Sequence, residues 1–279
     1  MILRNTRPRM VLGMGGFVSG PGGLMAWLMR YPLVIHEQNR IAGMTNRYLA
    51  PLADRVLEAF PGSLKPSLKT VCLGNPVRAD INAIEPPQQR LAKRKDSLHI
   101  LVLGGSLGAQ VLNQTMPKVI RQLDCEVRHQ AGSRGLTEAQ QAYRNEGLVV
   151  EVEAFIDDMA AAYAWADIVV CRAGALTIAE LTAAGVASIL VPYPYAVDDH
   201  QTANAHYLSD EGAAILLSQE TFIVSTVVEK LTELTANRDV LMQMACTARS
   251  LAQPEATKNI AAICQQAGYR NDGGESDDQ

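Results

Sequence analysis

Short, largely apolar runs recur along the chain, separated by longer segments that mix apolar and polar positions. Each run has the length and composition of a buried strand in a parallel sheet, and most of the segments between them have the spacing of helices. This alternation predicts an α/β protein with right-handed parallel crossovers. Strands are predicted at 10–12, 33–35, 55–59, 71–73, 99–103, 127–130, 149–152, 168–171 and 188–191. Helices are predicted at 44–52, 110–123, 137–145, 159–165, 177–184 and 257–267.

The stretch EPPQQRLAKRKD interrupts this pattern with prolines, glutamines and a basic cluster. It predicts an exposed linker over residues 85–95, and its basic side chains are expected to be solvated, with contact to anionic lipid as the alternative. A chain of 279 residues is long enough for two domains with their own cores. The expected parts are a first domain at 1–84, a second at 96–256, a C-terminal helix at 257–270 and a disordered tail at 271–279.

The overall composition excludes several classes of protein. With 48% hydrophobic residues and a net charge of −4, the chain lacks the basic excess of a nucleic-acid-binding protein. Its five cysteines are odd in number and widely spaced, which argues against a disulfide framework or a zinc site and favours a reducing cytoplasm. The uncharged run from Met10 to Met29 contains Pro21 and many glycines, so it is not expected to be a signal peptide or membrane span.

The segment ADIVVCRAGALTIAELTAAG, residues 166–185, predicts a buried strand, a tight loop and a helix. The start of such a helix offers unpaired N–H groups and the positive end of the helix dipole to an anion. Glu180 follows about one and a half turns later, where its carboxylate can accept hydrogen bonds from two neighbouring sugar hydroxyls. The alternative is an ordinary helix start with a solvated glutamate.

Two glycine-rich stretches follow predicted strands, at 13–23 and at 104–109. Glycines at this density let the backbone approach a ligand closely and present N–H groups to phosphate, and Ser106 adds a hydroxyl donor in the second stretch. A flexible turn remains the alternative for the first stretch, which is expected to lead into a helix through Trp27. Further polar candidates lie after strands, at 36–39, at Arg78 and at 200–201.

Taken in order, the stretches GMGGFVSGPGG, HEQN, GNPVR, GGSLGAQVLNQTMP, FIDDMAAAYAWAD, CRAGALTIAE and DDHQTANA resemble the MurG family of peptidoglycan N-acetylglucosaminyltransferases, from Pro8 to Ala267. The resemblance implies two Rossmann-like domains of the glycosyltransferase B architecture. The first, truncated at 1–84, would face the acceptor and the membrane, and the second would hold UDP-N-acetylglucosamine. It also implies inverting transfer to the muramyl 4-hydroxyl of lipid I, giving lipid II. The sequence has no evident acidic metal triad, so the chemistry is expected to need no metal ion, and no cofactor or nucleic-acid partner is expected.

The resemblance assigns donor-binding roles to residues at matching motif positions. Asn39 would meet the donor sugar, Arg78 its diphosphate and Ser106 a phosphate oxygen. Ile156 would face the uracil, Glu180 would hold the ribose hydroxyls and Gln201 would contact N-acetylglucosamine. The residues expected to bind through backbone groups are Ala175, Leu176, Thr177, Ile178 and Ala179. The acceptor diphosphate would lie against the loop containing Gly15, Gly16 and Ser19, where Phe17 replaces a frequent tyrosine.

The family begins with a further glycine-rich loop that ends in histidine, and the printed sequence has no such stretch. In the family that histidine is a candidate general base, so the catalytic base is unassigned here and His36 is the nearest candidate. A donor-binding chain with little turnover is therefore one expectation, with residues 96–267 folding well and residues 1–84 fragile. A third alternative is a UDP-N-acetylglucosamine 2-epimerase, which the stretch GMGGFVSGPGG argues against.

A membrane partner is expected on the cytoplasmic face of the bacterial inner membrane, as a peripheral contact. Trp27, with Leu24 and Leu28, can form an apolar patch, although core packing is the alternative for the two leucines. Basic residues nearby in sequence can attract anionic lipid. These are Arg30, Arg40 and Arg47.

Overall fold

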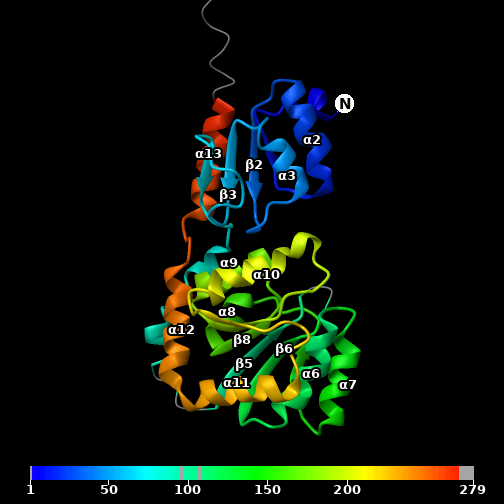
Figure 1. The fold of residues 1–279 in the computed structure, drawn as a ribbon, viewed down its shortest axis with the longest axis vertical. Helices are drawn as coiled ribbons and strands as arrows, with labels where there is room; N and C mark the ends of the chain where they lie inside the picture. The colour runs from blue at the N-terminus through cyan, green and yellow to red at the C-terminus, as the bar shows by residue number, and fades with distance from the viewer. Residues whose placement is uncertain (1, 93, 95–96, 106–107, 270–279) are drawn as a thin grey trace, which may run out of the picture. The chain divides into compact units, whose positions relative to one another are not determined.

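The computed structural model describes residues 2–92, 94, 97–105 and 108–269. The chain forms two compact units, and each is described separately below (Figure 1). The first unit contains residues 1–76 and 253–279, and the second contains residues 77–252. Both units are parallel α/β structures, which confirms the predicted fold class.

The first unit is built on a four-stranded parallel sheet in the order β1-β2-β3-β4. Strand β2 is buried on both faces, and its alternate residues pack into two different cores. Leu33 and Ile35 pack with helices α2 and α3, and Val34 packs with helix α13. The strands are β1 (Val11–Gly13), β2 (Leu33–Glu37), β3 (Arg55–Glu58) and β4 (Thr70–Cys72). The helices are α1 (Ile2–Thr6), α2 (Gly16–Leu28), α3 (Met44–Leu49) and α13 (Ala256–Tyr269).

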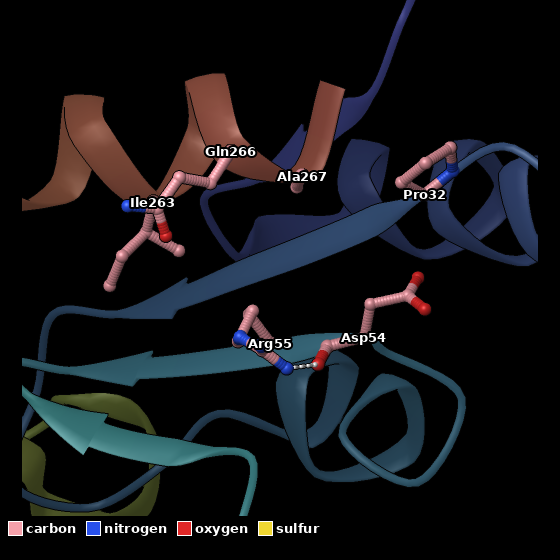
Figure 2. A pocket seen from close by; sticks show the side chains of 6 residues that line it. All are labelled: Pro32, Asp54, Arg55, Ile263, Gln266 and Ala267. Carbon is pink, nitrogen blue, oxygen red and sulfur yellow. Dashed lines mark hydrogen bonds between the residues drawn. The ribbon is translucent and has the colours of Figure 1, made fainter. Parts of the chain in front are cut away.

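A small cavity of about 80 Å³ lies at the amino ends of β2 and β3, beside α13 (Figure 2). Its wall includes Pro32 and Asp54, and the Asp54 carboxylate accepts the Leu33 N–H at 2.8 Å. Ligands of open parallel sheets bind at the opposite edge, beyond the carboxyl ends of the strands. This cavity is therefore not the candidate site.

The second unit is built on a six-stranded parallel sheet in the order β10-β9-β8-β5-β6-β7. The order reverses direction between β5 and β8, as in doubly wound folds, so the loops after these strands diverge and leave room for a ligand. The strands are β5 (Leu98–Leu103), β6 (Cys125–Gln130), β7 (Glu151–Glu153), β8 (Ile168–Cys171), β9 (Ala187–Leu190) and β10 (Ala214–Leu216). The helices are α4 (Ala79–Asn82), α5 (Pro87–Arg90), α6 (Gln110–Ile120), α7 (Leu136–Asn145), α8 (Met159–Trp165), α9 (Ala175–Ala184), η1 (Val197–Asp199), α10 (His200–Ser209), α11 (Val224–Ala236) and α12 (Arg238–Ser250).

The prediction of a glycine-rich loop at 13–23 is wrong over most of that range, because helix α2 begins at Gly16. The glycines have a different role there. A Cβ atom on Gly23 would lie 2.6 Å from Leu49 Cδ1, so this glycine lets α2 pack closely on α3. The segment is rich in glycine because two helices touch, and the loop proper is confined to the residues just after β1.

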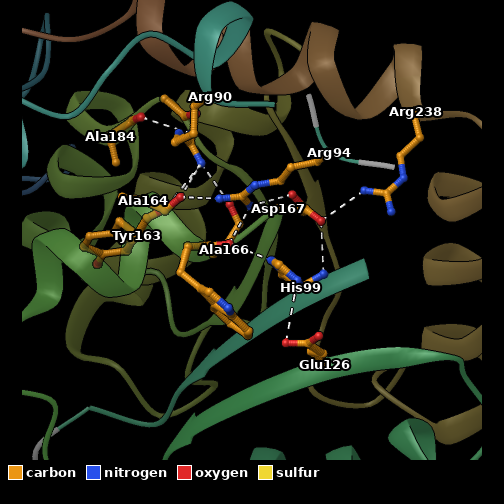
Figure 3. A network of polar contacts seen from close by, with 12 residues as sticks. Arg90, Arg94, His99, Glu126, Tyr163, Ala164, Ala166, Asp167, Ala184 and Arg238 are labelled. Atoms are coloured by element: carbon orange, nitrogen blue, oxygen red, sulfur yellow. Dashed lines mark hydrogen bonds and ion pairs between the residues drawn. The ribbon is translucent and has the colours of Figure 1, made fainter. Parts of the chain in front are cut away.

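The expected exposed linker at 85–95 also differs from the structure. Helix α5 lies within it, and the Arg90 guanidinium donates to the carbonyl oxygens of Ala166 at 2.9 Å and Gly185 at 2.6 Å (Figure 3). Arg94 forms an ion pair of 2.8 Å with Asp167 (Figure 3). The segment therefore belongs to the second unit. The boundary between the first and second units lies after Pro76 and not at the predicted linker. The predicted tail at 271–279 lies outside the described residues.

Candidate functional site

The loops that follow β5 and β6 pack against each other at the carboxyl edge of the second sheet. The Gly104 N–H donates to the Gln130 carbonyl oxygen at 2.8 Å. Gly108 and Gly132 have φ angles of 84° and 79°, and a Cβ atom on Gly132 would lie 2.2 Å from the Gly108 nitrogen. Only glycine combines this φ range with so close an approach. Glycine is thus required where the two loops meet, while the predicted phosphate donor Ser106 lies outside the described residues.

A buried chain of hydrogen bonds holds the second of these loops. Asn113 Nδ2 donates to the Ala131 carbonyl oxygen at 3.1 Å, which turns its Oδ1 toward His129 Nε2, also at 3.1 Å. His129 Nδ1 lies 3.0 Å from the Tyr143 hydroxyl. Burial lowers the pKa of His129 to about 3, so the ring is neutral, donates from Nε2 and accepts at Nδ1. A single tautomer therefore connects helix α7 to the loop after β6.

Helix α9 begins at the carboxyl end of β8 with a glycine in the N-cap position. Gly174 has no side chain with which to cap the first turn, so no N-cap side chain competes with an anion at this helix start. The preceding loop is fixed from the side, because Asn204 Nδ2 donates to the Ala173 carbonyl oxygen at 3.3 Å. The helix start expected at Ala175 is thus confirmed, and the expected binding through backbone groups of residues 175–179 stays a prediction.

Glu180 lies on α9 and receives a hydrogen bond from a residue that the sequence did not indicate. The Tyr163 hydroxyl, on α8, donates to Glu180 Oε2 at 2.9 Å. Burial raises the pKa of Glu180, while the hydrogen bond from Tyr163 and the positive charge of Arg78 oppose this effect. The charge of Arg78 therefore acts on Glu180, and the expected shared role of these two residues in donor binding stays a prediction. Tyr163 stands in an apolar helix and carries no sequence signal of this contact.

Gln201 and Arg172 together hold the turn after β9. Gln201 Oε1 accepts the Tyr193 N–H at 2.9 Å, and the Arg172 guanidinium lies 5.4 Å from the Tyr193 ring centroid. Arg172 also donates to the Pro192 carbonyl oxygen at 2.9 Å and to Gln219 Oε1 at 2.7 Å. One lone pair of the Gln201 amide oxygen is thus used within the protein, and the expected contact of Gln201 with the sugar stays a prediction.

Ile156 lies between β7 and α8, and its side chain is buried within the second unit. Its N–H donates to Gln130 Oε1 at 3.3 Å. Two residues later, Asp158 Oδ1 accepts the Ala161 N–H at 2.9 Å and caps α8. The backbone at Ile156 is therefore fixed from both sides, and its expected contact with uracil stays a prediction.

In the first unit, the HEQN stretch is organised by a buried glutamate. Glu37 Oε1 accepts the Asn39 N–H at 2.9 Å, and Oε2 accepts from Asn46 Nδ2 at 2.8 Å and the Gly43 N–H at 3.2 Å. The Asn39 side chain also donates to Glu37 Oε1, at 3.3 Å. Glu37, one of the polar candidates at 36–39, thus shapes the loop that carries Asn39.

His36 is fully buried, and its Nε2 lies 3.0 Å from the Gly74 carbonyl oxygen. Burial lowers the pKa of this ring. A general base must reach the proton that it removes, and a fully buried ring with one nitrogen held by the backbone does not. The structure therefore contradicts His36 as the catalytic base.

The predicted acceptor loop is shorter than expected. Gly15 is the N-cap residue of α2, Gly16 begins the helix, and Ser19 lies one turn inside it. The Ser19 hydroxyl donates to the Gly15 carbonyl oxygen. A Cβ atom on Gly15 would lie 3.4 Å from Asn46 Nδ2, so this short turn sits beside the loop that Glu37 organises.

Helix α2 carries an apolar face that the first unit leaves exposed. Trp27 borders this face and is 46% exposed, and Leu24 and Leu28 are 44% and 57% exposed, which overturns core packing for the two leucines. Arg30 and Arg47 are also exposed. Within the described parts of the chain, no helix has the length and apolar character needed to cross a membrane. The residues of the apolar face are Phe17, Val18, Leu24, Met25 and Leu28.

Comparison with known proteins agrees with this arrangement. The glycosyltransferase family 28 N-terminal domain matches residues 1–58, and the family 28 C-terminal domain matches residues 99–260. The N-acetylglucosamine transferase of Marinobacter nauticus that acts on N-acetylmuramyl-(pentapeptide) pyrophosphoryl-undecaprenol is 53% identical over 269 residues, or 95% of this chain and 74% of its own length. The crystal structure of Acinetobacter baumannii MurG superposes with a TM-score of 0.84 and 41% identity, covering 95% of this chain and 75% of that one.

A putative UDP-N-acetylglucosamine 2-epimerase from Listeria monocytogenes has a TM-score of 0.69 at 14% identity, covering all of this chain and 79% of that one. This likeness shows the shared glycosyltransferase B type of fold alone. The match to the Marinobacter transferase, by contrast, covers nearly the whole chain at 53% identity. The chain therefore belongs to glycosyltransferase family 28, among the MurG-type N-acetylglucosaminyltransferases.

Proposed function

We propose that the chain transfers N-acetylglucosamine from UDP-N-acetylglucosamine to the muramyl 4-hydroxyl of lipid I, with inversion, giving lipid II and UDP. The observation that carries this proposal is the 53% identity, over 95% of the chain, to a Marinobacter enzyme named for the same transfer. The arrangement of the second unit supports it, because loop backbone, a helix start and a carboxylate converge on one edge of the sheet. Relatives at this identity carry transferase names, which favours transfer over nucleotide-sugar binding alone.

The second unit supplies the donor-binding groups in this proposal. Glu180 accepts hydrogen bonds from the ribose hydroxyls, and the start of α9 and Arg78 face the diphosphate. The Arg78 side chain is half exposed, as a phosphate ligand must be. Asn39 and Gln201 contact the sugar, and the other proposed donor contacts are Ser106, Ile156, Ala175, Leu176, Thr177, Ile178 and Ala179.

The physical task of the site is to stabilise the leaving group. When the bond from the anomeric carbon to the diphosphate breaks, negative charge develops on the departing UDP. The positive end of the α9 dipole and the Arg78 guanidinium stabilise that charge without a metal ion. Preorganised donors of this kind are worth about 10²–10³ in rate for each donor removed.

The first unit supplies the acceptor-binding groups. The turn at Gly15 and Gly16, with the start of α2, receives the acceptor diphosphate, and Ser19 supports that turn through its hydroxyl. The apolar face of α2 contacts lipid, with Trp27 at its border and Arg30 and Arg47 attracting anionic headgroups. The location that we propose is the cytoplasmic face of the bacterial inner membrane, with the chain bound there as a peripheral protein.

The test is a transfer assay with UDP-N-acetylglucosamine labelled in the sugar and lipid I in mixed vesicles, followed by chromatography of the lipid product. Transfer gives labelled lipid II and free UDP in equal amounts, and Glu180→Ala lowers the rate. Calorimetry of donor binding runs in parallel. Donor binding without labelled lipid would contradict transfer and favour a binding role, while conversion of the donor to its 2-epimer would favour the epimerase.

A further inference from the structure

We infer that Tyr163 is a positioning residue that holds the Glu180 carboxylate in the orientation required to receive the two ribose hydroxyls of the uridine nucleotide. The inference rests on the proposed function, since it concerns the same site. Tyr163 itself is fully buried and touches no nucleotide; it acts through the hydrogen bond from its hydroxyl to Glu180 Oε2, 2.9 Å long.

Burial of Tyr163 favours this hydrogen bond. Tyr163 has no exposed surface, so water does not compete with Glu180 for its hydroxyl proton. Burial and the neighbouring Glu180 charge raise the pKa of Tyr163 well above its usual value, so the phenol stays protonated and always donates. Glu180 is only partly buried, so part of the residue is accessible from outside the protein.

The geometry of a carboxylate explains why one fixed contact matters. The last torsion of a glutamate side chain is broad, so a free carboxylate rotates. An ionised carboxylate has about four lone-pair sites, and Tyr163 takes one of them on Oε2. All of Oε1 and the second lone pair of Oε2 remain for two hydroxyl donors. Without the Tyr163 hydroxyl, the ligand itself must order the carboxylate, which weakens its binding.

The hydrogen bond from Tyr163 also affects the ionisation of Glu180. Glu180 must be ionised to accept from both ribose hydroxyls, but its burial favours the neutral form. The Tyr163 hydrogen bond and the Arg78 charge favour the ionised form, and the Asp80 charge opposes it. Tyr163 therefore both orients the carboxylate and helps to keep it charged.

Helix α8 places the hydroxyl because it is itself held at both ends. Asp158 caps its first turn, and the guanidinium of Arg90 donates to the carbonyl oxygens of Tyr163 at 3.3 Å and Ala166 at 2.9 Å (Figure 3). The donor of the critical hydrogen bond is thus rigid, which is what positioning requires.

The test compares the binding of UDP with that of 2′,3′-dideoxyuridine diphosphate, by calorimetry on the full chain. In Tyr163→Phe the ring remains and only the hydroxyl is lost. We expect this variant to bind UDP about three- to tenfold more weakly, with unchanged binding of the dideoxy nucleotide. Glu180→Ala should show the same selectivity, and Tyr163→Phe should add nothing in the Glu180→Ala background.

Tyr143→Phe is the matched control, because it also removes a buried hydroxyl that bonds to another side chain. It should leave the affinity ratio of the two nucleotides unchanged. If Tyr163→Phe does not fold, all tyrosines are replaced by 3-fluorotyrosine, which keeps every hydroxyl and lowers its pKa. The ratio of the affinities for UDP and the dideoxy nucleotide should then differ from that of the unaltered chain.

The outcomes separate the inference from the proposed function. Equal weakening of both nucleotides in Tyr163→Phe, or unchanged UDP affinity where Glu180→Ala weakens it, overturns the role of Tyr163 and leaves the ribose contact of Glu180 intact. In the fluorotyrosine protein, an unchanged ratio of the affinities for UDP and the dideoxy nucleotide likewise overturns the role of Tyr163. If Glu180→Ala also binds UDP as the unaltered chain does, the proposed donor site fails.

Discussion

The Arg90 guanidinium donates to the Gly185 carbonyl oxygen at 2.6 Å, where helix α9 ends. The same guanidinium donates to Ala166 after α8, so one side chain satisfies carbonyl groups at the ends of two helices (Figure 3). Burial lowers the pKa of Arg90 to about 10, so the group remains charged at neutral pH. Helix α9 carries Glu180 and helix α8 carries Tyr163, and Arg90 thus ties the carboxyl ends of these two helices together.

Arg90→Ala should destabilise the second unit, because it leaves several carbonyl oxygens without their donor. We expect a loss of about 2–4 kcal/mol in the free energy of unfolding. Urea unfolding followed by Trp165 fluorescence in a Trp27→Phe background measures this unit alone. Arg121→Ala, which breaks the exposed ion pair with Glu146, is the control and should change it by less than about 1 kcal/mol. Equal effects of the two variants would show that the buried contacts contribute little.

Gly132→Ala should disrupt the two loops that form the predicted phosphate site. Its Cβ atom would lie 2.2 Å from the Gly108 nitrogen, and its φ of 79° is unfavourable for alanine. Gly147→Ala is a matched control, with a φ of 73° and no atom within 4 Å of the added Cβ. Both variants lose about 1 kcal/mol to backbone strain, but only Gly132→Ala should also weaken UDP binding, by about tenfold or more. Calorimetry checks this, and equal UDP affinity in both variants would argue against the loop as a ligand site.

His129 should make the second unit less stable in mild acid. Burial lowers its pKa to about 3 in the folded protein, from 6.5 in the unfolded chain. The unfolded state therefore binds a proton below pH 6.5 that the folded state excludes, and stability falls until about pH 3. Between pH 7 and pH 5 the loss is about 2 kcal/mol. His129→Gln should lack this slope when unfolding is followed at Trp165, and an unchanged slope would assign the effect to other groups.

The sequence predicted the elements whose signal is local. The apolar runs at 99–103 and 168–171 became β5 and β8, and the carboxylate of Glu180 was placed on its helix correctly. Features that depend on distant partners were missed. Arg90 bonds to carbonyl groups 76 and 95 residues away, and no pattern within 85–95 encodes them. Tyr163 looks like any aromatic residue of an apolar helix, because only the tertiary fold brings its hydroxyl to Glu180.

Glycine-rich sequence was misread for a related reason. Glycine suits both a phosphate-binding loop and a close contact between two helices. Only the atoms that pack against the glycine distinguish these two cases. At Gly132 the neighbour is the loop at Gly108, whereas at Gly23 it is the Leu49 side chain. The glycine-rich segment after β5 is therefore a loop in its described residues, as predicted. Most of the glycine-rich segment after β1, which was also predicted as a loop, is helix α2.

Membrane binding should depend on the apolar face of α2. Phe17 is 90% exposed and Leu28 57% exposed, and burying such side chains is worth about 1.5–3 kcal/mol each. Because an interfacial helix buries them only in part, we expect Phe17→Ser with Leu28→Ser to weaken binding to vesicles of anionic phosphatidylglycerol by about tenfold or more. Sedimentation with the vesicles measures this. Leu68→Ser is the matched control, since Leu68 is fully exposed in the first unit but lies outside α2. An equal loss in the control would mean that general surface hydrophobicity, not this face, drives binding, and loss of binding in high salt alone would assign it to Arg30 and Arg47.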